Sequence, residues 1–104
     1  MAKYLLAYKG GAMADTPKEQ QKQMEAWMSW FGSLGEAVVD GGAAFGTAST
    51  LGSNGAVKDG GASRLSGYSI ITAETLADAG DKAKGCPVLA GGGSVEVYEA
   101  LPMG

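Results

Sequence analysis

Hydrophobic and polar positions alternate in some segments of this chain with the period of a strand, and recur in others with the period of a helix. The first pattern predicts four strands, at residues 3–9, 43–50, 65–72 and 94–101. The last of them is the most regular, because Val95 and Val97 fall on one face while Glu96 and Tyr98 fall on the other. The segment at 43–50 has the weakest pattern of the four.

A capping box predicts the start of the first and longer helix. Thr16 stands three residues before Glu19, and a proline between them suits the first helical position. Apolar residues then recur at steps of three and four, and together they predict one hydrophobic face: Met24, Trp27, Met28, Phe31, Leu34 and Val38. We expect the helix to end by residues 40–42, with a bend or local break at Gly32 or Gly35 because glycine disfavours a helix interior.

A second pair of capping residues predicts a shorter helix. Thr75 and Asp78 repeat the spacing of the first pair, so we expect this helix to begin directly after Thr75. Gly85 is placed to end it, and Pro87 prevents the helix from resuming.

The segment between the second and third predicted strands is rich in turn-forming residues. Residues 51–64 consist mainly of Gly, Ser, Asp and Asn, with Asp59-Gly60 as a hairpin-type turn signal. We expect either a loop or a short hairpin in this segment.

The predicted elements follow one another as strand, helix, strand, strand, helix and strand. This βαββαβ order is that of the ferredoxin-like fold, an α+β arrangement in which both helices cover one face of a four-stranded antiparallel sheet. A chain of 104 residues has the usual size of one domain, so we expect a single domain over residues 1–104.

Hydrophobic residues on both faces of the predicted strands indicate a homodimer. In the first strand Tyr4 and Leu6 face one side, while Leu5 and Ala7 face the other. Two helices cover only one face of the sheet, and a second apolar face needs another cover. The simplest cover is a second copy of the chain, sheet against sheet about a two-fold axis, which forms a dimeric α+β barrel.

Charge and composition exclude several classes of partner. The net charge is −3 and no dense stripe of Lys and Arg occurs, so we expect no nucleic-acid partner. No stretch approaches the roughly 18 consecutive apolar residues of a membrane span, and none has the form of a signal peptide. A single cysteine fits a reducing compartment, and we expect a cytoplasmic protein.

The sequence contains no histidine, which limits the chemistry available to it. Ser-His-Asp and Cys-His catalysis and His-ligated metal sites are excluded, and a homodimer cannot supply the missing imidazole. We expect no metal site and no cofactor. Any catalytic site must therefore use carboxylates, Lys, Tyr, Ser or Cys.

Several stretches of the sequence together resemble one protein family. They are the opening KYLLAYKGG, the helix MEAWMSWFGSLG, the turn DGG, the strand GYSII and the close AKGCPVLAGGGSVEVYE. Through them the chain resembles the YCII-related family, near its DGPF-type branch, over nearly its whole length. The resemblance implies a dimeric α+β barrel of two ferredoxin-like subunits. Most members have no known activity, and some look like small enzymes, including a dehydrochlorinase of aromatic degradation.

The catalytic pair proposed for that family has no counterpart in this chain. A His–Asp pair has been proposed as the site of those enzymes, and no His occurs here. Cys86 stands before Pro87 at the place where an Asp would precede a proline, and Lys9 stands where close relatives often carry His.

Three residues are candidates for proton transfer. Asp40, at the turn before two glycines, is either a general base in a partly desolvated position or a turn residue that accepts backbone N–H groups. Lys9 and Tyr8 end the first predicted strand, where a desolvated Lys serves as a base or nucleophile and a solvated one protects a sheet edge.

Aromatic residues are candidates for ligand binding. Trp27, Trp30 and Phe31 share one sector of the first helix, and either wall a pocket for a planar ligand or pack in the core. Trp30 lies off the main apolar stripe, which makes it the better pocket candidate. The remaining candidates would line the space enclosed by two sheets, or bond across the dimer: Tyr68, Glu96 and Tyr98.

Two functional hypotheses remain open from the sequence. The first is a homodimer that binds a small organic ligand in a cleft between the first helix and the sheet, with or without lyase- or isomerase-type proton transfer. The alternative is a non-catalytic dimeric interaction or regulatory module.

Overall fold

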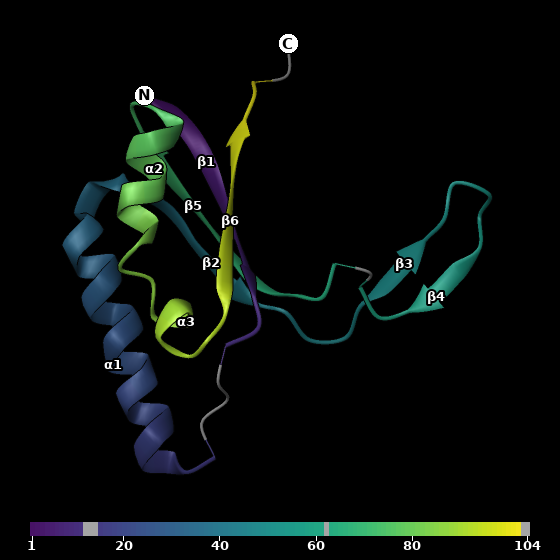
Figure 1. The fold of residues 1–104 in the computed structure, drawn as a ribbon, viewed down its shortest axis with the longest axis horizontal. Helices are drawn as coiled ribbons and strands as arrows, with labels where there is room; N and C mark the ends of the chain where they lie inside the picture. Colours follow the sequence, from purple (N-terminus) through teal and green to yellow (C-terminus); the bar gives the residue numbers. More distant parts are fainter. Residues whose placement is uncertain (12–14, 62, 103–104) are drawn as a thin grey trace.

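The structure is a computed structural model that describes residues 1–11, 15–61 and 63–102 (Figure 1). Within these ranges the elements follow in the order β1 (Ala2–Lys9), α1 (Pro17–Leu34), a 3-10 turn (Gly35–Ala37), β2 (Val38–Ala44), β3 (Ser49–Leu51), β4 (Val57–Asp59), β5 (Leu65–Ala73), α2 (Leu76–Ala83), α3 (Pro87–Ala90) and β6 (Ser94–Ala100). No helix in the described ranges is both long enough and apolar enough to cross a membrane.

Four of the strands form one antiparallel sheet, in the order β2-β5-β1-β6. The central strand β1 pairs on both sides, so that Leu6 lies opposite Ser69 of β5 and Val97 of β6. The predicted α+β class with a four-stranded antiparallel sheet is therefore confirmed. The strands predicted at 65–72 and 94–101 are also present, to within one residue at each end.

Local sequence starts α1 as predicted, but the helix ends earlier than expected. The Thr16 hydroxyl accepts the backbone N–H of Glu19 at 3.1 Å. The last helical residue is Leu34, because Gly35 takes a φ of +57°, a conformation that glycine adopts at little cost and that ends a helix. The break at Gly35 agrees with the sequence, but the helical stripe drawn as far as Val38 and the second strand at 43–50 are wrong, since β2 already begins at Val38.

The second predicted helix is confirmed, and a third helical turn follows it. The Thr75 hydroxyl accepts the backbone N–H of Asp78 at 3.0 Å, and α2 ends at Ala83. The sequence suggested that Pro87 would prevent a helix from resuming, but a new helical turn begins there. Pro87 occupies the first position of α3, where a proline fits because no N–H is needed there.

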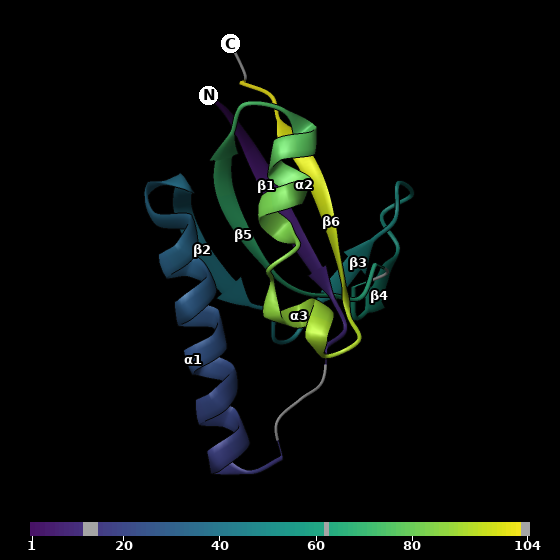
Figure 2. The same ribbon diagram turned by 60° about the vertical axis from the view of Figure 1, so that its left-hand side comes forward.

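All the described helices lie on one side of the four-stranded sheet (Figure 2). The core forms between them and includes Tyr4, Leu6, Tyr8, Trp30, Ile71, Ala79, Ala83 and Cys86. The buried side of α1 is only partly the predicted stripe: Trp27, Phe31 and Leu34 pack against the core as expected, but Met24 and Met28 lie in solvent and Trp30, off the stripe, is only 6% exposed. We call the opposite side of the sheet the open face; it carries Leu5, Ala7, Lys9, Tyr68, Ile70, Glu96 and Tyr98.

The strands β3 and β4 form a separate two-stranded hairpin, which we call the arm (residues 46–64, with residue 62 outside the description). Leu51 pairs with Val57, and the connecting turn is closed by a bond from Gly52 N to the Ala56 oxygen at 2.7 Å. The hairpin alternative for this segment is confirmed. The predicted turn at Asp59-Gly60 is wrong, since Asp59 lies in β4. Figure 1 shows the arm extending from the sheet on the side away from the helices.

Candidate functional site

A cavity of about 720 Å³ lies between α1 and the sheet, in the region where the sequence predicts a cleft. Its walls come from the end of β1, the middle of α1, the β2–β5 edge and the segment around α3. The residues that shape it most are Tyr8, Lys22, Ala26, Trp27, Phe31 and Val88. A concave and largely apolar hollow of this size is typical of sites that bind small organic molecules.

Aromatic rings form one wall of this cleft. Tyr8 meets Trp27 edge-on, with ring centroids 5.1 Å apart and planes at 67°. Phe31 lies 5.8 Å from Trp27 along the same helix. Aromatic pairs of this kind are favourable contacts, so the three rings support one another as a continuous wall.

On the opposite side of the cleft, glycine in β2 allows this strand to approach β5 very closely. At Gly42 the φ is +78°, and a Cβ atom would lie 1.7 Å from the backbone oxygen of Tyr68. Only glycine permits this approach of β2 to β5. The sequence DGG therefore encodes the close pairing of these strands.

The Tyr8 hydroxyl at the inner end of the cleft is held in a buried hydrogen-bond chain. It donates to Ser69 Oγ at 2.7 Å, and Ser69 Oγ in turn donates to the Gly41 carbonyl oxygen at 2.7 Å. Burial raises the pKa of the Tyr8 phenol far above its ordinary value. The hydroxyl is therefore protonated at neutral pH and does not serve as a base.

The Cys86 thiol lies in the same buried region. It is 2% exposed, and burial raises its pKa as well. A thiol in this state is a poor nucleophile, because the reactive form is the thiolate. Cys86 therefore acts as an apolar core residue.

One charged side chain, that of a lysine on α1, lines the cleft. Among the described residues that line it, Lys22 is the only one with an ionised side chain. It sits on the exposed part of α1, more than one turn before Trp27. The cleft therefore combines an aromatic wall with one cation at its rim.

Asp40 lies on the open face and is bonded twice. One carboxylate oxygen accepts the backbone N–H of Gly42 at 2.8 Å, and the other accepts the Tyr68 hydroxyl at 3.3 Å. The negative charge of Asp40 raises the pKa of Tyr68. Asp40 thus has the turn role that the sequence allows, and it also holds Tyr68, on which the Phe45 ring stacks at 5.8 Å.

Lys9, Glu96 and Tyr98 form a second polar group on the open face. The Lys9 ammonium lies 3.4 Å from Glu96 Oε2, and the Tyr98 hydroxyl donates to Glu96 Oε1. The Tyr98 hydrogen bond, with Lys9 beside it, lowers the pKa of Glu96. This group joins β1 to β6 and lies outside the cleft.

The structure does not bring the three proton-transfer candidates together. Tyr8 points to the helix side of the sheet, whereas Asp40 and Lys9 lie on the open face. The predicted pocket residue Trp30 lies in the core, where its indole Nε1 donates to the Lys82 carbonyl oxygen at 3.0 Å. Trp27, four-fifths of a turn earlier, lines the cleft instead.

Two residues of these sites were missed from the sequence. Lys22 lines the cleft because it lies on the side of α1 that Ala26 shares, four residues on, but the wrong choice of buried face hid that relation. Phe45 lies just beyond β2, inside the segment predicted as the second strand, but no signal in the sequence placed its ring against Tyr68.

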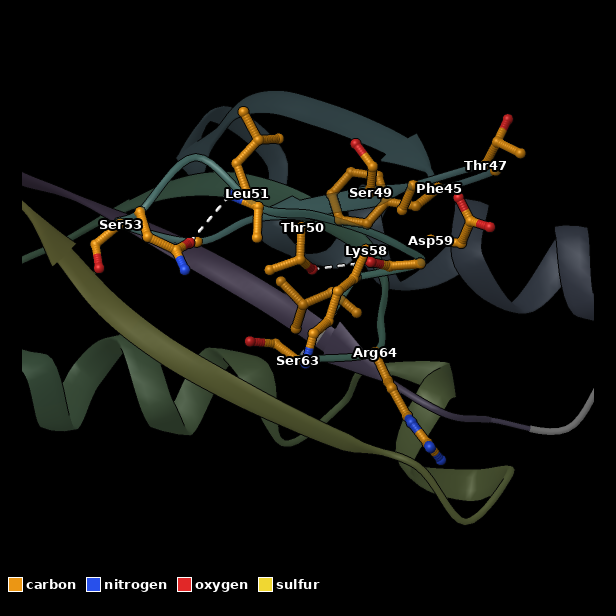
Figure 3. A pocket seen from close by; sticks show the side chains of 18 of the residues that line it. Phe45, Thr47, Ser49, Thr50, Leu51, Ser53, Lys58, Asp59, Ser63 and Arg64 are labelled. Carbon is orange, nitrogen blue, oxygen red and sulfur yellow. Dashed lines mark hydrogen bonds between the residues drawn. The ribbon is translucent and has the colours of Figure 1, made fainter.

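A second and larger hollow, of about 1480 Å³, lies at the arm. Its described lining comes from residues 44–65 alone and mixes polar side chains with apolar ones such as Phe45, Leu51 and Leu65. Figure 3 shows the Thr50 hydroxyl bonded to the Gly60 carbonyl oxygen, at 2.8 Å, and Arg64 extending away from the other labelled side chains. Because one segment lines the whole hollow, nothing else in the described subunit closes it.

Among the described residues, no group of three or more Asp, Glu or Cys side chains is arranged to hold a metal ion. Comparisons of the chain with models of protein families, with curated proteins and with solved structures give no match. The geometry of the cleft and of the open face is therefore the basis for assigning a function.

Proposed function

We propose that this chain is a homodimeric protein that binds a small organic ligand between α1 and the sheet, without transforming it. The observation that carries this proposal is the cleft itself. It is about 720 Å³ in volume, which is ample for a small organic molecule, and its wall of Tyr8, Trp27 and Phe31 is held by ring-to-ring contacts.

The distribution of ionisable groups favours binding over catalysis. A general base must lie within hydrogen-bond reach of the proton that it removes. Asp40 and Lys9 are on the other side of the sheet from the cleft, and both are bonded to neighbours there. Tyr8 and Cys86 are on the correct side, but burial keeps both protonated. A proton-transfer reaction in the cleft therefore lacks a base.

The lining of the cleft favours a flat organic acid as the ligand. Aromatic walls gain dispersion and hydrophobic energy from a planar ring system, and Lys22 supplies a cation for one carboxylate at the rim. A ligand with several negative charges would find no second cation among the described lining residues.

For the fold, we propose the ferredoxin-like arrangement in a dimeric α+β barrel, as in the YCII-related family that the sequence resembles. The order of the elements and the sheet order β2-β5-β1-β6 support the ferredoxin-like assignment. The open face supports the dimer, since Phe45 and Tyr98 are about half exposed there, beside Tyr68 and Ile70. A second copy on this face would cover them.

Calorimetry and thermal-shift measurements with 2-naphthoate as the probe test ligand binding. We expect 2-naphthoate to raise the melting temperature and to bind at one site per subunit, because a ligand of the folded state stabilises it. Ala26→Trp places an indole in the cleft and should abolish the effect. The matched control Ala77→Trp changes an alanine that is also exposed, on α2 and away from the cleft, and should keep the effect.

Lys22→Gln tests the role of the cation. The variant should weaken 2-naphthoate binding about two- to fivefold, the usual contribution of an exposed ion pair, and should leave binding of the neutral analogue 2-naphthalenemethanol unchanged. If 2-naphthoate binds equally well to the wild type and to Ala26→Trp, the ligand does not occupy the cleft and the proposal fails.

A second candidate function, a non-catalytic interaction module, is favoured by the open face and the arm. Both carry exposed hydrophobic side chains outside the cleft, Tyr98 on the open face and Leu51 and Val57 on the arm. If neither naphthalene probe nor other aromatic acids shift the melting temperature while the protein is a stable dimer, this second function is the better one.

A further inference from the structure

We infer that the arm clasps a second copy of this chain, with Leu51 and Val57 packed against the partner beside its open face. This inference rests on the proposed homodimer. It adds to that dimer a specific element, the arm, and an apolar anchor at its end.

The arm lacks support within its own subunit. The main contacts of β3 and β4 are with each other, and the arm extends away from the sheet (Figure 1). An isolated two-stranded hairpin is only marginally stable in water, because it buries too little apolar surface. A hairpin with three paired residues on each strand therefore needs a surface to pack against.

The apolar residues of the arm are placed to meet such a surface. Leu51 and Val57 lie directly opposite each other in the hairpin, and they are 69% and 64% exposed. Side chains paired in this way form one continuous apolar contact. Adjacent aliphatic side chains that are mostly exposed in a free subunit are typical of a site that becomes buried in an interface.

The arm and the open face border the same space. The helices occupy the opposite side of the sheet in both ribbon views, while the arm leaves the sheet on the open side (Figures 1 and 2). A second copy seated on the open face therefore lies within reach of the arm. By two-fold symmetry its own arm would reach back in the same way, which doubles every contact that one arm makes.

The distribution of charge favours a second copy over other partners. The arm segment 46–64 holds two cations, Lys58 and Arg64, and one acid, Asp59. The rest of the chain holds six cations and ten acids. A basic arm thus faces an acidic body, and a two-fold dimer places each arm against the body of the other copy. Two cations are too few for a nucleic acid or an anionic membrane to be the occupant.

The unpaired state of the arm cations agrees with this assignment. Within the described residues, Lys58 and Arg64 take part in none of the ion pairs, which join Lys9 to Glu96, Lys82 to Asp78 and Lys84 to Asp81. Arg64 also has a φ of +54°, an uncommon conformation for a residue with a side chain. The hollow at the base of the arm, which one segment lines, would be closed by the partner.

Analytical ultracentrifugation of the full chain tests the inference with the double variant Leu51→Glu/Val57→Glu. Both positions lie in solvent in the subunit, so the subunit should fold as before, which circular dichroism checks. We expect the dissociation constant of the dimer to rise at least about tenfold, because the variant places charge in a buried apolar contact four times per dimer. A smaller rise would overturn the inference.

Met28→Glu is the matched control, since Met28 is 67% exposed and lies on the outer side of α1. It should leave the dissociation constant unchanged. If Met28→Glu weakens the dimer as much as the arm variant does, the interface lies on the helix side and the inference is wrong.

Photo-crosslinking locates the contact directly. Benzoylphenylalanine in place of Leu51 should give a covalent dimer, with the attached peptide from β1, β5 or β6 of the second copy. The same probe in place of Met28 should give none. Covalent dimers through α1, or no covalent dimer with the probe in the arm, would contradict the inference.

The outcomes separate the inference from the proposals on which it depends. A wild-type chain that sediments as a monomer overturns both the dimer and the clasp, whereas ligand binding in the α1 cleft is measured independently. If the wild type is a dimer but neither the arm variant nor the arm crosslinks affect or report it, only the proposed role of the arm is overturned.

Discussion

The Tyr8 hydroxyl donates a hydrogen bond of 2.7 Å to Ser69 Oγ, although the two residues are 61 positions apart in the chain. Ser69 Oγ in turn donates to the Gly41 carbonyl oxygen. The strands β1, β5 and β2 are therefore joined by side-chain hydrogen bonds as well as by their backbone pairing. Ser69 is fully buried, and tyrosines aside it is the only polar side chain that is buried among the described residues. The bond thus ties the inner end of the cleft to the β2 edge.

Ser69→Ala should destabilise the protein more than Tyr8→Phe does. Tyr8→Phe removes one donor and leaves Ser69 bonded to Gly41, so we expect a loss of about 1 kcal/mol in the free energy of unfolding. Ser69→Ala leaves both the Tyr8 hydroxyl and the Gly41 oxygen without this partner, and we expect a loss of about 2–3 kcal/mol. Urea unfolding of the two variants measures the difference. Equal losses would show that the bond to Gly41 contributes little.

Stability should fall at alkaline pH in a way that depends on Tyr8. Burial raises the pKa of Tyr8 in the folded state above the ordinary value of about 10 that it has in the unfolded chain. The folded state therefore holds the phenolic proton more tightly, and the free energy of unfolding decreases as the pH rises above about 10. Each pH unit beyond that point removes up to about 1.4 kcal/mol.

Tyr8→Phe cannot lose this proton, so its stability should fall less steeply over the same pH range. Urea unfolding at several pH values between neutral and alkaline conditions compares the two slopes. Parallel curves for the wild type and Tyr8→Phe would mean that the Tyr8 proton is held equally in both states.

Gly42→Ala should disrupt the β2 edge, whereas Gly41→Ala should not. A Cβ atom at Gly42 would lie 1.7 Å from the Tyr68 oxygen, and the φ of +78° is strained for alanine. We expect a loss of more than about 3 kcal/mol, or displacement of β2. A Cβ atom at Gly41 meets open space, so that variant should stay within about 0.5 kcal/mol of the wild type. Thermal unfolding and amide exchange of β2 distinguish the two variants.

Trp30→Phe should cost more stability than Trp27→Phe. Trp30 is buried, and its indole N–H satisfies the Lys82 carbonyl oxygen, so its replacement leaves a cavity and a lost hydrogen bond worth about 2 kcal/mol. Trp27 is half-buried and lines the cleft, and Trp27→Phe should cost less than about 1 kcal/mol. Differential scanning calorimetry of the two variants tests this order. The reverse order would place Trp27, and not Trp30, in the core.

Elements with local signals were predictable, and elements that depend on distant contacts were not. Both capping residues, Thr16 and Thr75, bond the N–H three residues on, as the sequence indicates. The boundary between α1 and β2 was misplaced because Val38 continues the helical spacing of apolar residues. Its strand conformation comes from pairing with Ile71 of β5, far along the chain. Only the positive φ of Gly35 marks the change locally.

The candidate site shows the same division. Tyr8 and Lys9 are neighbours in a strand, so sequence alone was enough to place them on opposite faces of the sheet. It could not tell which face the helices cover, and that choice put Tyr8 in the cleft and left Lys9 with Glu96 on the open face. It also could not tell that Asp40, on a strand with register shifts, would turn toward Tyr68.

The sequence by itself determined the α+β class, the start of each long helix, the strands at the centre and at one edge of the sheet, and the exclusion of histidine chemistry. These features depend on composition or on residues within a few positions of one another. Only the tertiary structure decided which side of α1 is buried, which aromatic ring lines the cleft, and which of the proton-transfer candidates lies on the helix side of the sheet. Those features depend on how α1 rotates against the sheet, and that rotation is set by the packing of Trp30 against residues more than 50 positions away.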